Sequence, residues 1–207
     1  MALIKLNNKA VSNATAFGSI SSLGSMTFIK KLTASGSATL SFVDGASGVV
    51  LDDTYKEYYF TLNNIHPSAN GSLLAMNLSI DSGSNYNVAK TTTFFYALNA
   101  ENDSYAAIAY AAGDDLAQGT GFQPIAPIGY GNDECGSAYM SLFNPSSTTF
   151  VKHFLINSSS LQDAGDMYER NNYAAGYANT TSAVNAVQFK MLSGNIDLGD
   201  ICLYGIA

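Results

Sequence analysis

Apolar and polar residues alternate along much of the chain. In the clearest case, residues 74–80, the large apolar side chains occupy every second position (Leu74, Met76, Leu78 and Ile80). Asn77 and Ser79 fall between them. A period of two places successive side chains on opposite faces of a β-strand. This segment is therefore predicted to be a strand with one buried face and one exposed face.

The same alternation predicts strands along most of the sequence. Residues 55–65 place three large side chains on one face (Tyr58, Phe60 and Leu62). Residues 184–191 do the same with another three (Val187, Phe189 and Met191). Further strands are predicted over residues 2–6, 26–32, 38–43, 92–98, 137–143, 150–156, 168–178 and 199–206.

Turn-forming residues separate these segments. Residues 66–72 contain a proline and an Asn-Gly step, and residues 81–85 are short and polar. Both stretches are predicted to be turns. We therefore expect residues 55–65 and 74–80 to pair as an antiparallel hairpin. The serine run at 157–160 is interpreted as the end of the strand before it.

Two stretches give weaker patterns. Residues 104–116 are rich in alanine and fit either a short helix or an edge strand. Residues 118–135 contain four glycines and two prolines and are interpreted as a long loop. Loops of this length are usually functional or cover another part of the molecule.

Composition supports the β interpretation. Hydrophobic residues make up 47% of the chain and charged residues only 12%, with 13 tyrosines and 11 phenylalanines. Helix surfaces usually carry more Glu, Lys and Arg, whereas aromatic residues suit a pleated, half-buried surface. We predict an all-β protein: one antiparallel β-sandwich over residues 1–207, jelly-roll-like, with residues 1–50 as a candidate N-terminal attachment segment.

Charge and hydropathy limit the classes of partner. The net charge is −7, and the only adjacent basic pair is Lys30-Lys31. Nucleic-acid binding requires clustered basic residues, so it is not expected. No apolar run approaches the length that spans a bilayer. The start, Met1–Asn8, lacks the pattern of a signal peptide. We expect the protein to be synthesised in a cytoplasm and to carry no export signal.

Cysteine and histidine suggest no reactive centre. Cys135 and Cys202 form no CxxC pair and are interpreted as two small buried thiols, with their pairing left open. His153 shares the parity of its apolar neighbours at 151 and 155 and is expected to be half-buried or hydrogen-bonded. His66 precedes a proline in the predicted turn and is expected to be solvated. No phosphate-binding loop or nucleophile elbow occurs.

Acidic residues occur in three adjacent pairs, at 52–53, 114–115 and 133–134. Two carboxylates suffice for glycoside hydrolysis, but these pairs are interpreted as solvated loop acids. Residues 81–85 lack the ligand spacing of a calcium loop. We therefore predict no catalytic residue, cofactor or metal, and a protein that is not an enzyme.

Tyrosine is the most suggestive residue type. Seven tyrosines cluster in the middle and in the polar strand near the C-terminus (Tyr105, Tyr110, Tyr130, Tyr139, Tyr168, Tyr173 and Tyr177). Exposed tyrosines favour protein interfaces and can stack on sugars. The alternative, given equal weight, is that these tyrosine rings fill the interior and the ends of the sandwich.

Two segments carry a resemblance to a known group of proteins. Tyr58–Pro67 ends in Asn-Ile-His-Pro, and Leu73–Tyr86 contains Leu-Ser-Ile-Asp-Ser-Gly. Both resemble small virion proteins of marine tailed bacteriophages, as do the opening at Met1–Asn8 and the ending at 193–206. The shared motifs are turns and strands, so they imply no catalytic residues.

The resemblance implies a place on the exterior of a virion, as a capsid decoration or a tail-associated protein. Such a protein is assembled in the host cytoplasm and acts through contacts with other virion proteins. A homo-oligomer is expected, with a trimer preferred. The alternatives are a receptor-binding module for host surface glycans and a glycan hydrolase. Head or tail location and the identity of a ligand stay open.

Overall fold

The protein is an all-β sandwich. The computed structural model describes residues 25–163 and 167–207, and every regular element in these ranges is a β-strand. The large sheet has eight strands, in the order β1 (Met26–Thr33), β12 (Ile196–Ile206), β3 (Glu57–Pro67), β8 (Gly136–Phe143), β9 (Lys152–Asp163), β10 (Met167–Ala178), β5 (Lys90–Ala100) and β6 (Ala106–Tyr110). The small sheet has four, in the order β2 (Leu40–Val43), β11 (Ala186–Met191), β4 (Ser72–Ser79) and β7 (Gln123–Ile128).

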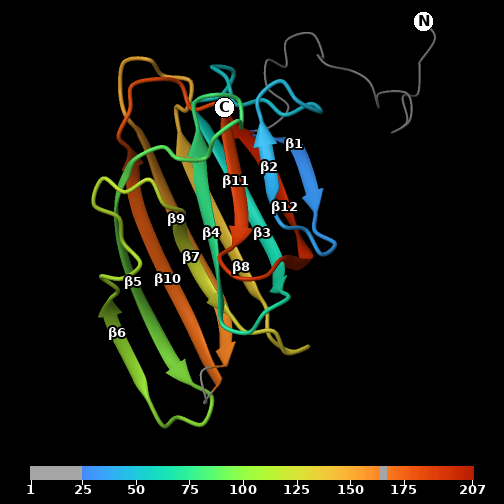
Figure 1. Cartoon of the computed structure of the whole chain (residues 1–207), viewed down its shortest axis with the longest axis vertical. Helices are drawn as coiled ribbons and strands as arrows, with labels where there is room; N and C mark the ends of the chain where they lie inside the picture. Colours follow the sequence, from blue (N-terminus) through green and yellow to red (C-terminus); the bar gives the residue numbers. More distant parts are fainter. Residues whose placement is uncertain (1–24, 164–166) are drawn as a thin grey trace, which may run out of the picture.

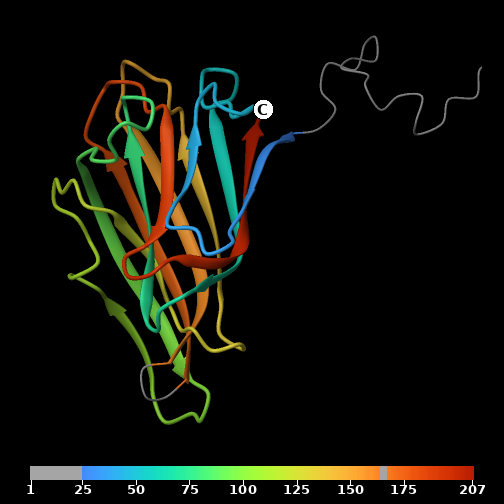
Figure 2. The same ribbon diagram turned by 45° about the vertical axis from the view of Figure 1, so that its right-hand side comes forward.

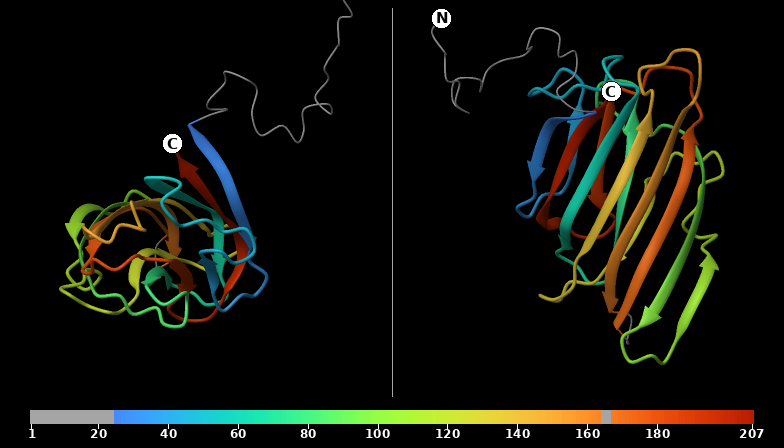
Figure 3. Two further views of the ribbon diagram at one scale, coloured as in Figure 1. Left: turned by 90° about the horizontal axis from the view of Figure 1, so that it is seen from above. Right: turned by 180° about the vertical axis from the view of Figure 1, so that it is seen from behind.

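The two sheets form two layers of unequal size (Figure 1; Figure 3, left). The lower parts of β5, β6 and β10 extend beyond the small sheet (Figure 1). At the other end, β1 begins beside the C-terminus (Figure 2), where the Ala207 amide donates to the Ser25 carbonyl at 3.0 Å. The predicted antiparallel sandwich is confirmed, and the jelly-roll likeness stays a prediction.

An aromatic cluster lies at the centre of the core. The rings of Phe42 and Phe60 are 5.4 Å apart, and Phe189 is 5.5 Å from Phe60. All three side chains are completely buried. Aromatic pairs at such separations add stabilisation beyond that of area burial alone. The inward faces predicted for residues 55–65 and 184–191 are confirmed.

The predicted hairpin between residues 55–65 and 74–80 is wrong. β3 belongs to the large sheet and β4 to the small one, so the chain between them crosses from one layer to the other. His66 and Pro67 lie within β3 and not in a turn. Two strands that face each other across a core show the same alternation as two paired strands, because both patterns reflect only burial of one face.

β4 is buried on both faces, which also differs from the prediction. Asn77 and Ser79 are buried, whereas Ile80 is exposed. The Asn77 side-chain amide donates to the carbonyls of Tyr86 at 2.6 Å and Thr120 at 3.0 Å. These contacts come from the segments on either side of β5 and β6, which cover the outer face of β4.

The structure decides three other predictions about elements, of which two are wrong and one is confirmed. The predicted loop 118–135 contains β7, whose two prolines are tolerated because β7 is an edge strand. The serine run 157–160 continues β9 instead of ending it. Residues 104–116 contain the edge strand β6, which confirms one of the two alternatives.

The N-terminal region contributes to the sandwich. β1 and β2 lie within the candidate attachment segment 1–50, and Phe42 of β2 is in the core. The strand predicted over residues 2–6 lies outside the described residues.

Candidate functional site

The outer face of the large sheet carries a row of side chains that crosses six strands. Cross-strand partners in an antiparallel sheet lie on the same face. The register therefore aligns one residue from each of β3, β8, β9, β10, β5 and β6: Thr61, Tyr139, Asn157, Tyr173, Phe95 and Tyr110. The strands that carry this row are seen face on in Figure 3, right.

The rings on this face stack in two pairs. Tyr59 and Tyr139, on β3 and β8, have centroids 6.0 Å apart and planes 26° from parallel. Phe95 and Tyr173, on β5 and β10, are 5.0 Å apart and 10° from parallel. Strand order places Tyr139 and Tyr173 on the inner side of each pair, toward β9. Two stacks therefore flank the central strand.

Between the two stacks lies a pocket of 410 Å³, lined by all four rings, with Leu155 and Asn157 of β9 among its other lining residues. It continues into a pocket of 520 Å³ at one end of β9 and one of 280 Å³ at the other, which share lining residues with it. We call the three together the outer groove. Its volume is in the range of small-molecule sites. Its lining contains no Asp, Glu, Lys or Arg.

Asn157 lies in the row between Tyr139 and Tyr173. Its amide nitrogen donates to Asn171 Oδ1 at 3.0 Å and to the Asn172 carbonyl at 3.2 Å. Its Oδ1 accepts no hydrogen bond from the residues that the structure describes. The Asn157 side-chain amide is thus held in one orientation between the two ring stacks, with its Oδ1 free to accept a hydrogen bond.

The predicted tyrosines are divided between several surroundings. Tyr139 and Tyr173 line the outer groove, and Tyr177 lies beside His153 at one end of it. Tyr110 donates to Asp115 at the sheet edge. Tyr105 and Tyr130 are exposed away from the groove, and Tyr168 is half-buried. None of the seven belongs to the core of the described residues.

Sequence reasoning missed Tyr59, Phe95 and Asn157 as members of this face. A signal for Tyr59 was present, because its neighbours Tyr58 and Phe60 both face inward. A residue between two inward residues of a strand must face outward.

The two histidines differ from their predictions. His153 is exposed together with Leu155, because Lys152, Phe154 and Ile156 supply the buried face of β9. His66 is half-buried, with Nε2 3.2 Å from the Gly131 carbonyl and Nδ1 3.7 Å from Asp197. The expected solvation of His66 is wrong.

Two of the predicted solvated acids are instead shielded from water. Asp114 is half-buried, 3.8 Å from the Arg170 guanidinium, and burial raises the pKa of its carboxyl. Glu134 is buried and accepts a hydrogen bond from the Gly131 amide.

Residues 81–85 do form the predicted turn. Hydrogen bonds from Ser79 and Asn85 lower the pKa of Asp81 to about 2.

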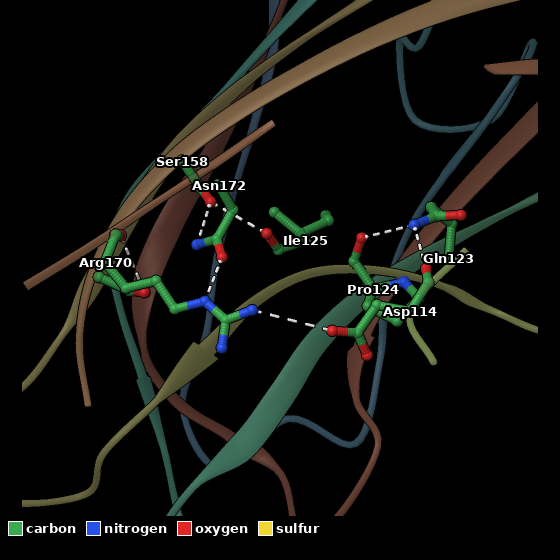
Figure 4. Close-up of polar contacts among 8 residues, drawn as sticks. Asp114, Gln123, Pro124, Ile125, Ser158, Arg170 and Asn172 are labelled. Carbon is green, nitrogen blue, oxygen red and sulfur yellow. Dashed lines mark hydrogen bonds and ion pairs between the residues drawn. The ribbon is translucent and has the colours of Figure 1, made fainter. Parts of the chain in front are cut away.

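Arg170 belongs to a polar network inside the sandwich (Figure 4). Its Nε donates to Asn172 Oδ1 at 2.7 Å, and its guanidinium lies 3.8 Å from the Tyr96 ring centroid. The Gln123 amide donates to the Asp114 carbonyl at 3.0 Å. Asp114 is therefore held in a fixed contact that joins its loop to β10.

Two lysines are also buried. Lys90 Nζ donates to Asn77 Oδ1 at 2.5 Å and to the Val88 carbonyl at 2.8 Å. Burial lowers its pKa to about 8. Lys152 Nζ donates to the Thr180 carbonyl at 3.2 Å. Neither ammonium forms an ion pair among the described residues.

Cys135 and Cys202 do not pair. Both are free, and Cys135 is exposed while Cys202 is buried. The prediction of two buried thiols therefore holds for Cys202 alone. Cys135 follows the buried Glu134 in the segment that leads into β8, and its side chain faces solvent.

The described residues contain no group of three or more His, Cys, Asp or Glu side chains that could hold a metal ion. Within the same ranges no helix is long and apolar enough to cross a membrane. A scan against protein-family models matches no family, and searches of curated proteins and of solved structures find no match for the chain.

Proposed function

We propose that this chain is a non-catalytic structural protein of a bacteriophage virion exterior, which assembles with further copies by strand pairing at the free edge of β6. The observation that carries the proposal is that β6 is the one edge strand in the described structure that lacks charge, proline and bulge and also exposes a large apolar side chain, Ile108. Exposed strand edges are templates for pairing with another chain.

The other three edges are protected in recognisable ways. β1 carries Lys30 and Lys31 and an irregular register next to Phe28. β2 has only four residues, and β7 contains two prolines. Charges, bulges, short strands and prolines all oppose edge pairing. β6 has the sequence Ala-Ala-Ile-Ala-Tyr, with no charge and no proline, and Ile108 at its centre is 83% exposed.

The hydrogen-bond pattern identifies the free groups of this edge. The Ala111 amide donates to the Phe94 carbonyl and the Ala100 amide to the Tyr105 carbonyl. Because bonded and non-bonded pairs alternate in an antiparallel ladder, Ala107 and Ala109 bond to β5. The amide and carbonyl of Ile108, the residue between them, therefore point away from β5, as do those of Ala106 and Tyr110.

The virion assignment rests on the sequence resemblance at 58–67 and 73–86. Self-assembly from identical copies also suits a chain with 12% charged residues, because association removes apolar surface from water. The contacts that hold Asp114 and Glu134 in place support a structural role for these acids over a hydrolytic one.

Light scattering on purified protein tests the assembly step, with proline as the probe of backbone pairing. Ile108→Pro removes an amide that β5 does not use, so the fold should persist while the oligomer dissociates to monomers. Ile108→Thr keeps the amide and should retain the wild-type mass. A monomeric wild type at micromolar concentration would contradict the proposal.

The measured mass also decides the symmetry. Pairing of two β6 strands across a two-fold axis closes as a dimer, so a dimeric mass is expected from this edge. A trimer, which the phage resemblance favours, would contradict pairing through β6 and would require a different contact between copies. Mass spectrometry and electron microscopy of purified phage particles test the location. The chain should be present in many copies on the head or tail, and its absence from particles would exclude a virion role.

A second candidate function is recognition of host surface glycans. The outer groove favours it, because its aromatic walls and uncharged polar groups form a ligand site that assembly at the β6 edge does not use.

A further inference from the structure

The two ring stacks are spaced to hold one flat ring between them. Tyr139 and Tyr173 lie on β8 and β10, with only β9 between these strands. Neighbouring strands are about 4.8 Å apart, so the Cα atoms of the two residues are separated by about 10 Å. The shorter Asn157 side chain lies in the row between them, and an occupant would lie above it. Stacked rings have centroids about 4.5–7 Å apart. A single ring between Tyr139 and Tyr173 would therefore contact both.

The lining of the pocket between the two stacks favours an uncharged molecule. The three pockets are lined by no Asp, Glu, Lys or Arg, and His153, at one end of the groove, is the lining side chain that can carry a positive charge. Burial raises the pKa of the Tyr59 phenol, which keeps this group neutral. Between the two stacks a phosphate or carboxylate would find no cation. The carboxylates of Glu57 and Glu169 lie behind the lining residues Ser141 and Ser159 and already accept hydrogen bonds from them.

The polar groups of the groove suit a ring with hydroxyls around its rim. Asn157 supplies a free carbonyl acceptor between the walls, and the phenols of Tyr139 and Tyr173 supply donors. The hydroxyls of Ser159 and Thr61 continue along one end. A molecule with apolar faces and a hydroxylated rim is a pyranose sugar.

An aromatic ring on each side of the bound sugar, Tyr139 on one and Tyr173 on the other, favours some pyranoses over others. A sugar with an axial hydroxyl has one face blocked by a polar group. A β-glucopyranose ring carries all of its ring substituents in equatorial positions and presents C–H bonds on both faces. The geometry points to a site for β-linked glucose or N-acetylglucosamine chains, with one sugar ring held between Tyr139 and Tyr173.

The length of the groove suits an oligosaccharide. Its lining follows β9 from His153 to Ser159, a distance of about 20 Å for a strand. The site is independent of the proposed assembly, because pairing at the β6 edge extends the sheet in its own plane and leaves the outer face open.

Calorimetric titration with cellohexaose tests the site on the full-length protein. The wild type should bind it, and Tyr173→Ala should weaken binding by at least about tenfold through loss of one stacking wall. Tyr173→Phe keeps the wall and should bind within about threefold of wild type. Tyr130→Ala removes an exposed tyrosine outside the groove and should leave binding unchanged.

Mannohexaose tests the two-wall argument, because mannose has an axial hydroxyl. Binding at least about tenfold weaker than that of cellohexaose is expected. Equal binding of the two sugars, an unaffected Tyr173→Ala, or no binding of cellohexaose by the wild type would each overturn the proposal. So would a wild-type oligomer that Tyr173→Ala dissociates, since a second copy would then occupy the groove. Ile108→Pro should leave cellohexaose binding unchanged, which separates this site from the assembly edge.

Discussion

Residues of the same type lie in different surroundings in this protein, depending on which segments of the chain pack over them. Asn77 and Asn63 both occupy strand positions, yet Asn77 is buried and Asn63 is exposed. Lys31 reaches Asp200 at the surface at 3.2 Å, whereas Lys90 is buried against the Asn77 side chain and a backbone carbonyl. A buried ammonium without a carboxylate partner is costly, so its proton is held less tightly in the folded state.

Lys90 should make stability depend on pH in the alkaline range. Its pKa falls to about 8 in the folded protein from the ordinary lysine value of 10.5. Between these values the unfolded chain binds a proton that the folded chain does not, so stability rises with pH. We expect the free energy of unfolding to increase by up to about 2 kcal/mol from about pH 8 to about pH 9.5, relative to Lys90→Met.

Urea denaturation of both proteins across this range measures the difference. The two stability profiles should run parallel below about pH 7 and diverge above it, because the folded state has lost half of the Lys90 proton at about pH 8. Parallel profiles would show that Lys90 keeps an ordinary affinity for its proton despite its burial.

At the scale of elements, alternation identifies strands but does not identify the neighbours of a strand. Nor does it identify the buried face when both faces of the strand carry large side chains. β9 shows this limit. His153 and Leu155 alternate with Phe154 and Ile156, and both sets contain large side chains. The sheet orients Phe154 into the core and leaves Leu155 54% exposed in the outer groove.

Adjacent alanine substitutions should separate the two faces of β9. Phe154→Ala removes a completely buried ring and should cost about 3–5 kcal/mol of unfolding free energy. Leu155→Ala should cost less than about 1 kcal/mol, because its side chain already contacts water. Chemical denaturation gives both values, and similar costs for the two variants would mean that this register of β9 is wrong.

At the scale of the molecule, the sandwich depends on pairing between the ends of the described chain. β1 pairs with β12, with Met26 opposite Ile206. β2 lies at the edge of the small sheet and contributes Phe42 to the core. Residues 26–43 therefore complete both sheets.

Truncation tests how far the sandwich extends. Removal of residues 1–50 deletes β1, β2 and the Phe42 ring, and should abolish cooperative unfolding. Removal of residues 1–24 deletes no member of the described core and should leave the melting temperature within a few degrees of the full chain. Scanning calorimetry measures both. A cooperative transition in the shorter fragment would instead identify residues 1–50 as a separate attachment segment.

The sequence by itself determined the fold class, the position of most strands and the inward faces of β3 and β11. These depend on local alternation, which records whether a side chain faces the core or water. Tertiary structure decided that β3 and β4 lie in different sheets and that Asn77 is buried. It also aligned Tyr139, Asn157 and Tyr173 in one row. These features depend on contacts between residues far apart in the chain, and a period of two contains no information about which distant strand supplies them.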